Sequence, residues 1–150
     1  MQNILHSNRP GYTLIEMLTV IAVVAMISGI AFVLPSVVTG STELDQTTEE
    51  VAEWVNAAHT ASLFGINHQP HGVYLENNQL VQFVGSSFAT RDVSLDRWLD
   101  IPSGILLAGT KEIVFSSING EPNVSGGWTL SKSGFSSRSI NVNILGTVDW

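Results

Sequence analysis

The chain has 150 residues, a formal net charge of −7 and no cysteine. This length predicts a single domain. The acidic balance argues against a sequence-independent nucleic-acid binder, because such proteins need basic surface to displace counterions. The lack of cysteine excludes a disulfide framework and a thiolate metal site. Any exported part of this chain must therefore be held together by packing alone.

The N-terminus begins with a short polar segment, Met1–Pro10, which carries Arg9. After it, Met17–Leu34 is an uncharged apolar run about as long as a helix that crosses a bilayer. Basic flanks stay in the cytoplasm, so we expect Tyr12 on the cytosolic side and the residues beyond the run outside. An ordinary secretory signal has a shorter apolar region.

One carboxylate, that of Glu16, stands at the front edge of the apolar run. A charged side chain costs roughly 2.5–3.5 kcal/mol at the centre of a membrane and less near the interface, which predicts a partner for this carboxylate. If the chain were cut after Gly11, the new α-amine of Tyr12 would lie about one helical turn from Glu16. The sequence thus suggests a pairing between an acid and a new N-terminus.

These residues belong to a recognisable motif, Gly11-Tyr12-Thr13-Leu14-Ile15-Glu16-Met17-Leu18. It resembles the processing site of type IV prepilins and type II secretion pseudopilins, although Tyr12 replaces the usual Phe and Met17 a usual Leu. The resemblance implies that prepilin peptidase cuts after Gly11 and N-methylates Tyr12, and that Glu16 serves assembly. The implied partners are this peptidase, other pilin or pseudopilin subunits, the inner membrane and an assembly platform.

Two other interpretations fit the same N-terminus. In the first, Val38-Thr39-Gly40 is the signal-peptidase site of an ordinary secretory signal. In the second, the apolar run is a plain signal anchor for an extracytoplasmic binding protein. Cleavage after Gly11 would distinguish both from a pilin-type precursor.

Helical periodicity continues beyond the apolar run. Pro35 and Gly40 predict a weakening or kink, and Thr47 and Glu50 have the spacing of a capping box unless they lie within a continuous helix. A stripe of apolar and small residues recurs at three- and four-residue steps: Leu44, Thr48, Val51, Val55, Ala58 and Ser62. Five acids in the same stretch indicate a solvated face or a contact with a basic surface on a neighbouring subunit: Glu43, Asp45, Glu49, Glu50 and Glu53.

After Gly65 the pattern becomes that of β-strands. The dipeptide Asn77-Asn78 separates two runs, Gly72–Glu76 and Gln79–Val84, and predicts a β-hairpin. Further strands are predicted at Ile105–Ala108, Lys111–Ser117, Trp128–Lys132 and Ile140–Ile144, of which the last shows the clearest alternation. Trp54 and Trp128 are expected in the core, and Trp98 and Trp150 on the surface.

A helix followed by about six strands predicts an α+β fold, in which a long N-terminal transmembrane helix packs on an antiparallel β head. The expected parts are a leader (1–11), the transmembrane and assembly half of the helix (12–35), its outer half (36–66) and the β head (67–150). The order of strands and turns in the head resembles that of H-type minor pseudopilins and FimT-type minor pilins. The resemblance implies a minor structural subunit of a type II secretion pseudopilus or type IV pilus, with a major subunit as the alternative.

No catalytic, metal or cofactor site is predicted, and nothing in the sequence argues for an enzyme. His68 and His71 are closely spaced, but Pro70 prevents one helix face from presenting both, so with His59 they are interpreted as loop histidines. The segment 134–138 lacks the final glycine of a nucleophile elbow.

A DNA-uptake minor pilin, the alternative that the FimT resemblance implies, would need a basic patch. The candidates are Lys111, Lys132 and Arg138. The acidic total argues against such a patch. We therefore expect neither nucleic acid nor a small-molecule substrate as a partner.

Overall fold

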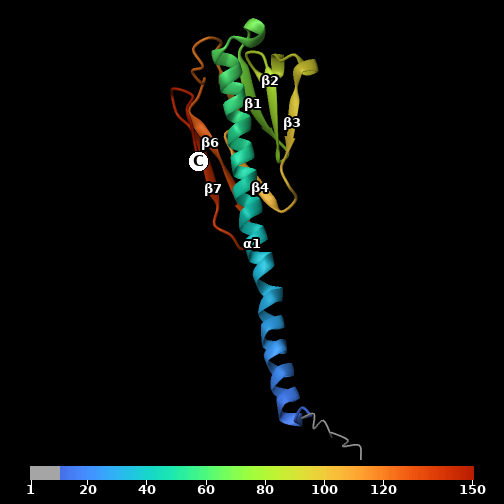
Figure 1. The fold of residues 1–150 in the computed structure, drawn as a ribbon. Helices are drawn as coiled ribbons and strands as arrows, with labels where there is room; N and C mark the ends of the chain where they lie inside the picture. The colour runs from blue at the N-terminus through green and yellow to red at the C-terminus, as the bar shows by residue number, and fades with distance from the viewer. Residues whose placement is uncertain (1–10) are drawn as a thin grey trace, which may run out of the picture. The chain divides into compact units, whose positions relative to one another are not determined.

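The computed structural model describes residues 11–150, apart from the side chains of residues 29–39. It divides into two compact units, Met1–Thr39 and Gly40–Trp150. We call the second unit the head. Helix α1 spans Leu14–Leu63 and contributes to both units (Figure 1). The predicted leader, except for Gly11, lies outside the described residues.

Within the described residues, no helix is long and apolar enough to cross a membrane. The predicted span, Met17–Leu34, extends into residues 29–39, whose side chains lie outside the described part of the chain. The side chain of Pro35 also lies outside the described part, but the backbone of α1 is helical at this residue.

Two antiparallel sheets of four strands form the rest of the head (Figure 1). The first has the order β3-β2-β1-β5, and the second the order β4-β6-β7-β8. The strands are β1 (His71–Glu76), β2 (Gln79–Val84), β3 (Arg97–Asp100), β4 (Ile105–Gly109), β5 (Glu112–Phe115), β6 (Gly126–Lys132), β7 (Arg138–Val142) and β8 (Val148–Asp149). Three short 3-10 turns complete the element order: η1 (Ile66–His68) lies between α1 and β1, and η2 (Phe88–Thr90) and η3 (Val93–Leu95) lie between β2 and β3. The predicted α+β class is confirmed.

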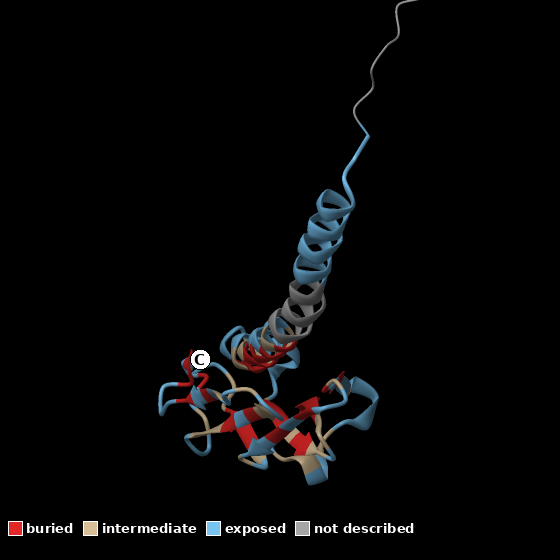
Figure 2. Cartoon of the chain, turned by 90° about the horizontal axis from the view of Figure 1, so that it is seen from below, coloured by how far each residue is buried: buried red, intermediate tan, exposed pale blue. Residues whose placement is uncertain are grey.

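The hydrophobic core lies between α1 and the two sheets. All six residues of the predicted helical stripe are buried, and they pack with the inward side chains of the strands: Val73, Leu80, Ile113, Phe115, Trp128, Leu130 and Ile140. In Figure 2 the buried part of the helix, in red, lies on the side that faces the strands. Trp128 is a core residue and Trp54 packs against the core, whereas Trp98 and Trp150 are exposed, as expected.

The predicted hairpin is present and has a second role. Asn77 and Asn78 have φ values of 46° and 64°, so they form the tight turn between β1 and β2. The side-chain amide of Asn78 also donates to the carbonyl of Ile105 at 2.9 Å and accepts from the N–H of Leu107 at 2.7 Å. It therefore fills hydrogen-bonding positions along the outer edge of β4 and joins the two sheets.

The outer edge of β5 is closed in a similar way. The side-chain oxygen of Asn123 accepts from the N–H of Val114 at 2.9 Å, and the N–H of Asn123 donates to the carbonyl of Val114 at 2.8 Å. Edge strands with unpaired backbone groups invite pairing with other chains. In this head, two of the four edges are thus occupied by asparagine side chains.

The structure decides between the two alternatives for Thr47, and one prediction about a strand end is wrong. Thr47 does not begin a helix: its hydroxyl donates to the carbonyl of Glu43 at 2.8 Å, within the continuous helix α1. The last long strand ends at Val142 and not at Ile144. Asn143 ends it, because its side-chain oxygen accepts from the N–H groups of Leu145 and Thr147 and so forms a turn.

Candidate functional site

The predicted cleavage site lies immediately before α1. Gly11, Tyr12 and Thr13 belong to no helix or strand and are exposed, and α1 begins at Leu14. Apart from its chain neighbours, no described residue has a heavy atom within 4 Å of the position that a Cβ of Gly11 would occupy. Among the described residues, the Gly11–Tyr12 peptide bond is therefore sterically open.

Thr13 and Glu16 form the first turn of α1. The Thr13 hydroxyl accepts from the backbone N–H of Glu16 at 3.3 Å, and the Glu16 carboxylate accepts from the backbone N–H of Thr13 at 3.5 Å. This reciprocal arrangement is a capping box, and the longer of its two bonds is weak. The position of Glu16 also suits its charge, since the N-terminal end of a helix favours an anion.

The helix behind this turn has an apolar surface that the described part of the chain leaves exposed. Every large apolar side chain from Leu14 to Ile27 is more than half exposed. An exposed apolar surface of this extent marks a contact with lipid or with other protein. The candidate site therefore combines an open peptide bond, a carboxylate in the first turn and an apolar helix.

The first turns of α1 within the head are held by the β6–β7 hairpin. The ring of Phe135 lies so close to Gly40 that a Cβ there would be 2.3 Å from its Cζ. Lys132 pairs with Glu43 at 2.6 Å, and Arg138 pairs with Asp45 at 2.7 Å. Two of the five acids between Glu43 and Glu53 are thus paired within the chain.

These pairs also concern the basic patch that a DNA-uptake minor pilin would need. Lys132 and Arg138, two of its three candidates, each face a carboxylate of α1. The third, Lys111, lies 5.0 Å from the centre of the Tyr74 ring. All three candidates interact within the chain: two form ion pairs with carboxylates, and the third lies over an aromatic ring.

The histidines occupy three different environments. The prediction of loop histidines is wrong for His59, which lies on α1, and for His71, which begins β1 and is buried. It holds for His68, in the exposed turn η1. Among the described residues, no group of three His, Cys, Asp or Glu side chains could hold a metal ion.

His59 packs against two turns of the head, at Gly120 and Gly146. Its ring centre lies 5.2 Å from that of Phe115, and a Cβ on Gly120 or Gly146 would come within 2.7 Å of its Nε2. This Nε2 is buried and has no hydrogen-bond partner among the described residues. Burial lowers the pKa of His59 below its ordinary value.

Sequence reasoning missed two of these features. It did not identify Thr13 as the helix cap, although a threonine three residues before a glutamate and ahead of an apolar run is the usual signal. It also missed the contact between Phe135 and Gly40, for which a local pattern gives no signal.

Comparison with known proteins gives one match to the N-terminal motif and one match to the fold. Residues 6–32 match the family described as the prokaryotic N-terminal methylation motif. The structure is similar to that of the minor pseudopilin EpsH from the Type 2 Secretion System of Vibrio cholerae, with a TM-score of 0.55 and 10% sequence identity. The match covers 71% of this chain and 94% of the EpsH chain, and at this identity the likeness concerns the fold. No curated protein matches the chain.

The motif and the fold agree with each other. The methylation motif covers the open peptide bond, the carboxylate and the start of the apolar helix, and the likeness to EpsH covers most of the chain. The chain therefore carries the prokaryotic N-terminal methylation motif at its N-terminus and has a fold similar to that of the minor pseudopilin EpsH.

Proposed function

We propose that this protein is a structural subunit, a minor pilin or pseudopilin, of a type II secretion pseudopilus or a type IV pilus. The observation that carries the proposal is the open Gly11–Tyr12 bond directly before an apolar helix whose side chains are exposed in the single chain. In this proposal, prepilin peptidase cuts after Gly11 and N-methylates Tyr12. The role is structural and not enzymatic, and it needs no cofactor or small-molecule substrate.

The apolar half of the helix has two successive environments in this proposal. Before assembly, residues 12–35 lie in the inner membrane as a single span, and the head is extracytoplasmic. During assembly on the platform, the helix moves from lipid to a filament core formed by other subunits. Its apolar side chains exchange one apolar surrounding for another, so the transfer has little hydrophobic cost.

The carboxylate of Glu16 gives this transfer its specificity. In the uncut chain it accepts from the N–H of Thr13. After cleavage, the amine of Tyr12 remains cationic when methylated, and we propose that Glu16 of one subunit pairs with this amine of a neighbour. Removing one member of a buried pair leaves the other unpaired, at a cost of about 3–5 kcal/mol.

The proposal is tested by determining the N-terminal residue and the mass of the mature chain from producing cells. We expect a chain that begins with a monomethylated Tyr12. Replacing Gly11 by valine should block cleavage, because valine places a bulky side chain next to the bond that the peptidase cuts. An intact leader, or a chain that begins after the apolar helix, would exclude a pilin-type subunit.

A further inference from the structure

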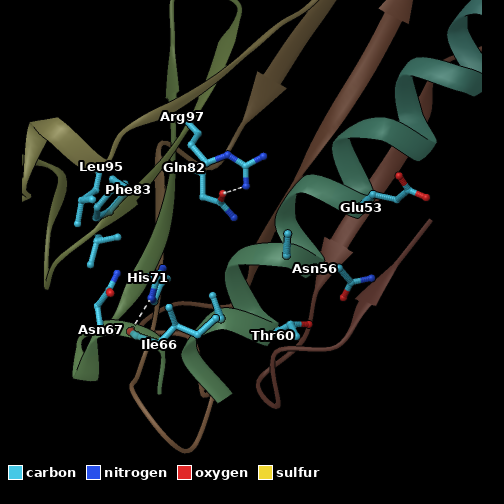
Figure 3. A pocket seen from close by; sticks show the side chains of 13 residues that line it. Glu53, Asn56, Thr60, Ile66, Asn67, His71, Gln82, Phe83, Leu95 and Arg97 are labelled. Carbon is cyan, nitrogen blue, oxygen red and sulfur yellow. Dashed lines mark hydrogen bonds between the residues drawn. The ribbon is translucent and has the colours of Figure 1, made fainter. Parts of the chain in front are cut away.

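A groove lies beside α1, where β3 begins at Arg97, opposite Gln82, while β2 continues to Val84. Its volume is about 570 Å³. α1 forms one wall through Ala57, Thr60 and Ala61, and the other wall contains Phe83, Val84 and Leu95 (Figure 3). Most of the groove is therefore apolar, and a buried apolar side chain would fit it.

One end of the groove carries two hydrogen-bond donors. Arg97 projects from β3 and donates to the side-chain oxygen of Gln82 at 3.3 Å. Because an arginine side chain can only donate, Gln82 must turn its oxygen toward Arg97, and its amide nitrogen then points the other way. Figure 3 shows this nitrogen directed away from the guanidinium. Gln82 is 7% exposed, so the groove contains a buried polar group whose orientation is fixed.

The charge of Arg97 distinguishes it from the other arginines of the head. Arg91 is paired with Asp96 at 2.8 Å, and Arg138 is paired with Asp45 at 2.7 Å. Among the described residues, no carboxylate lies within ion-pair distance of Arg97, whose guanidinium instead lies 4.8 Å from the centre of the Trp54 ring. Glu53 also lines the groove, but its carboxylate points away from Arg97 (Figure 3).

This unpaired cation stands out in an acidic head. Of the 13 acidic and 6 basic side chains of the chain, only Glu16 and Arg9 precede Gly40, so the head holds 12 acids and 5 bases. An arginine held over an aromatic ring, with donors unused, suits a carboxylate, which its planar guanidinium can bind in a bidentate manner. The complementary ligand has a carboxylate next to an apolar side chain.

We propose that this groove receives an extended segment of a neighbouring pilin-type subunit, in which an aspartate or glutamate stands next to a large apolar residue. The carboxylate binds Arg97 and Gln82, and the apolar side chain lies between Ala57 and Leu95. This inference rests on the proposed function, because it takes the neighbour to be a subunit of the same filament. It adds a contact between heads to the contact between N-terminal helices.

The test is a photo-crosslinking experiment on the full chain in producing cells. A benzoylphenylalanine residue is placed at Thr60, an exposed position that lines the groove, and in a control at Gln46, an exposed position of the same helix outside it. We expect Thr60 to crosslink to a peptide of a pilin-type subunit that contains an acidic residue beside a large apolar one. The Gln46 control should not give this product.

Charge variants show whether the carboxylate matters. Arg97→Glu should lower the Thr60 crosslink about tenfold or more, because a hydrogen bond to a charged group is lost and repulsion replaces it. Arg97→Lys should retain most of the Thr60 crosslink, because the positive charge remains. Ala57→Glu places a negative charge at an exposed groove position without touching Arg97, and should lower the crosslink as well, whereas the matched variant Gln46→Glu should not.

The outcomes separate this inference from the proposed function. A crosslink to lipid, to a protein without the pilin fold or to a peptide without a carboxylate would overturn it. So would a crosslink of unchanged strength in both Arg97→Glu and Ala57→Glu. Cleavage after Gly11 and presence in sheared filaments test the proposed function independently, since neither depends on the groove.

Discussion

The hydroxyl of Ser62, in the last turn of α1, donates a hydrogen bond to the carbonyl of Phe115 at 3.0 Å. The same oxygen accepts from the backbone N–H of His71 at 2.9 Å. One buried side chain therefore joins the end of the helix to two neighbouring strands, β1 and β5. The carbonyl of Ser62 also accepts from the N–H of Ile118 at 2.8 Å, so the turn after β5 is fixed to the same point.

Replacing Ser62 by alanine removes only one hydroxyl group but should destabilise the head strongly. The variant leaves a buried N–H and a buried carbonyl without their partner, and each such group costs about 1–3 kcal/mol. We expect the free energy of unfolding to fall by about 2 kcal/mol or more. Urea denaturation of the detergent-solubilised chain measures this, and Ser133→Ala, in an exposed loop, should change it by less than about 0.5 kcal/mol.

The side chain of Asn78 allows a test of the closed edge of β4. Asn78→Gly keeps the positive φ of the turn but removes both bonds to Ile105 and Leu107. Asn77→Gly is the matched control, because Asn77 shares the turn and is exposed. We expect Asn78→Gly to lower the free energy of unfolding by about 1–3 kcal/mol and Asn77→Gly to leave it nearly unchanged. Equal effects in the two variants would mean that the turn, and not the edge, determines stability.

The stability of the head should depend on pH through His59. Its pKa is lowered by burial in the folded chain, so the unfolded chain binds the proton more readily. The contribution of the neutral ring is therefore complete above the ordinary pKa of about 6.5 and is lost as the pH falls below it. The recorded neighbours of the ring, Phe115, Gly120 and Gly146, carry no charge that could offset this loss.

The measurement is the urea midpoint of the chain between pH 7.5 and pH 5. In the parent chain the midpoint should fall over this range. His59→Gln does not titrate, so its midpoint should fall less steeply, even if the variant is less stable throughout. An identical slope in both chains would assign the pH dependence to other groups.

Local patterns predicted those parts of the fold that local interactions determine. The turn at Asn77-Asn78 was predictable because it requires positive φ at two successive residues, which asparagine tolerates. The buried stripe of α1 was predictable because its period is that of a helix. In contrast, β3 has one buried residue among four, Leu99, and β8 has two residues, so neither shows an alternation and both were missed.

The two threonine-glutamate pairs show why a pattern alone is insufficient. Thr13 and Glu16 cap a helix, whereas Thr47 and Glu50, with the same spacing, lie in its middle. Thr47 and Thr48 are buried against the head, and their hydroxyls donate to carbonyls one turn back. Tertiary packing continues the helix through the second pair. The groove at Arg97 was likewise unpredictable, because residues from α1, β2 and β3 meet there only in the fold.

The capping bond of Glu16 raises the question of whether its charge or its hydrogen bond matters for assembly. In Glu16→Gln the side chain keeps an oxygen that can accept from the N–H of Thr13, but the negative charge is lost. In Glu16→Ala both are lost. If Glu16 pairs with the amine of a neighbouring Tyr12, the two variants should be incorporated into filaments equally poorly, because either leaves that amine without a counter-charge.

Both variants should still be cut after Gly11, since the peptide bond precedes the helix and stays open. The measurement compares the mature chain in sheared filaments with that in the membrane fraction for the parent chain, Glu16→Gln and Glu16→Ala. Thr13→Val is the matched control: it removes the hydroxyl of the cap, worth about 0.5–2 kcal/mol, and keeps the carboxylate. If Glu16→Gln assembled normally while Thr13→Val and Glu16→Ala did not, helix capping and not charge pairing would be the role of Glu16.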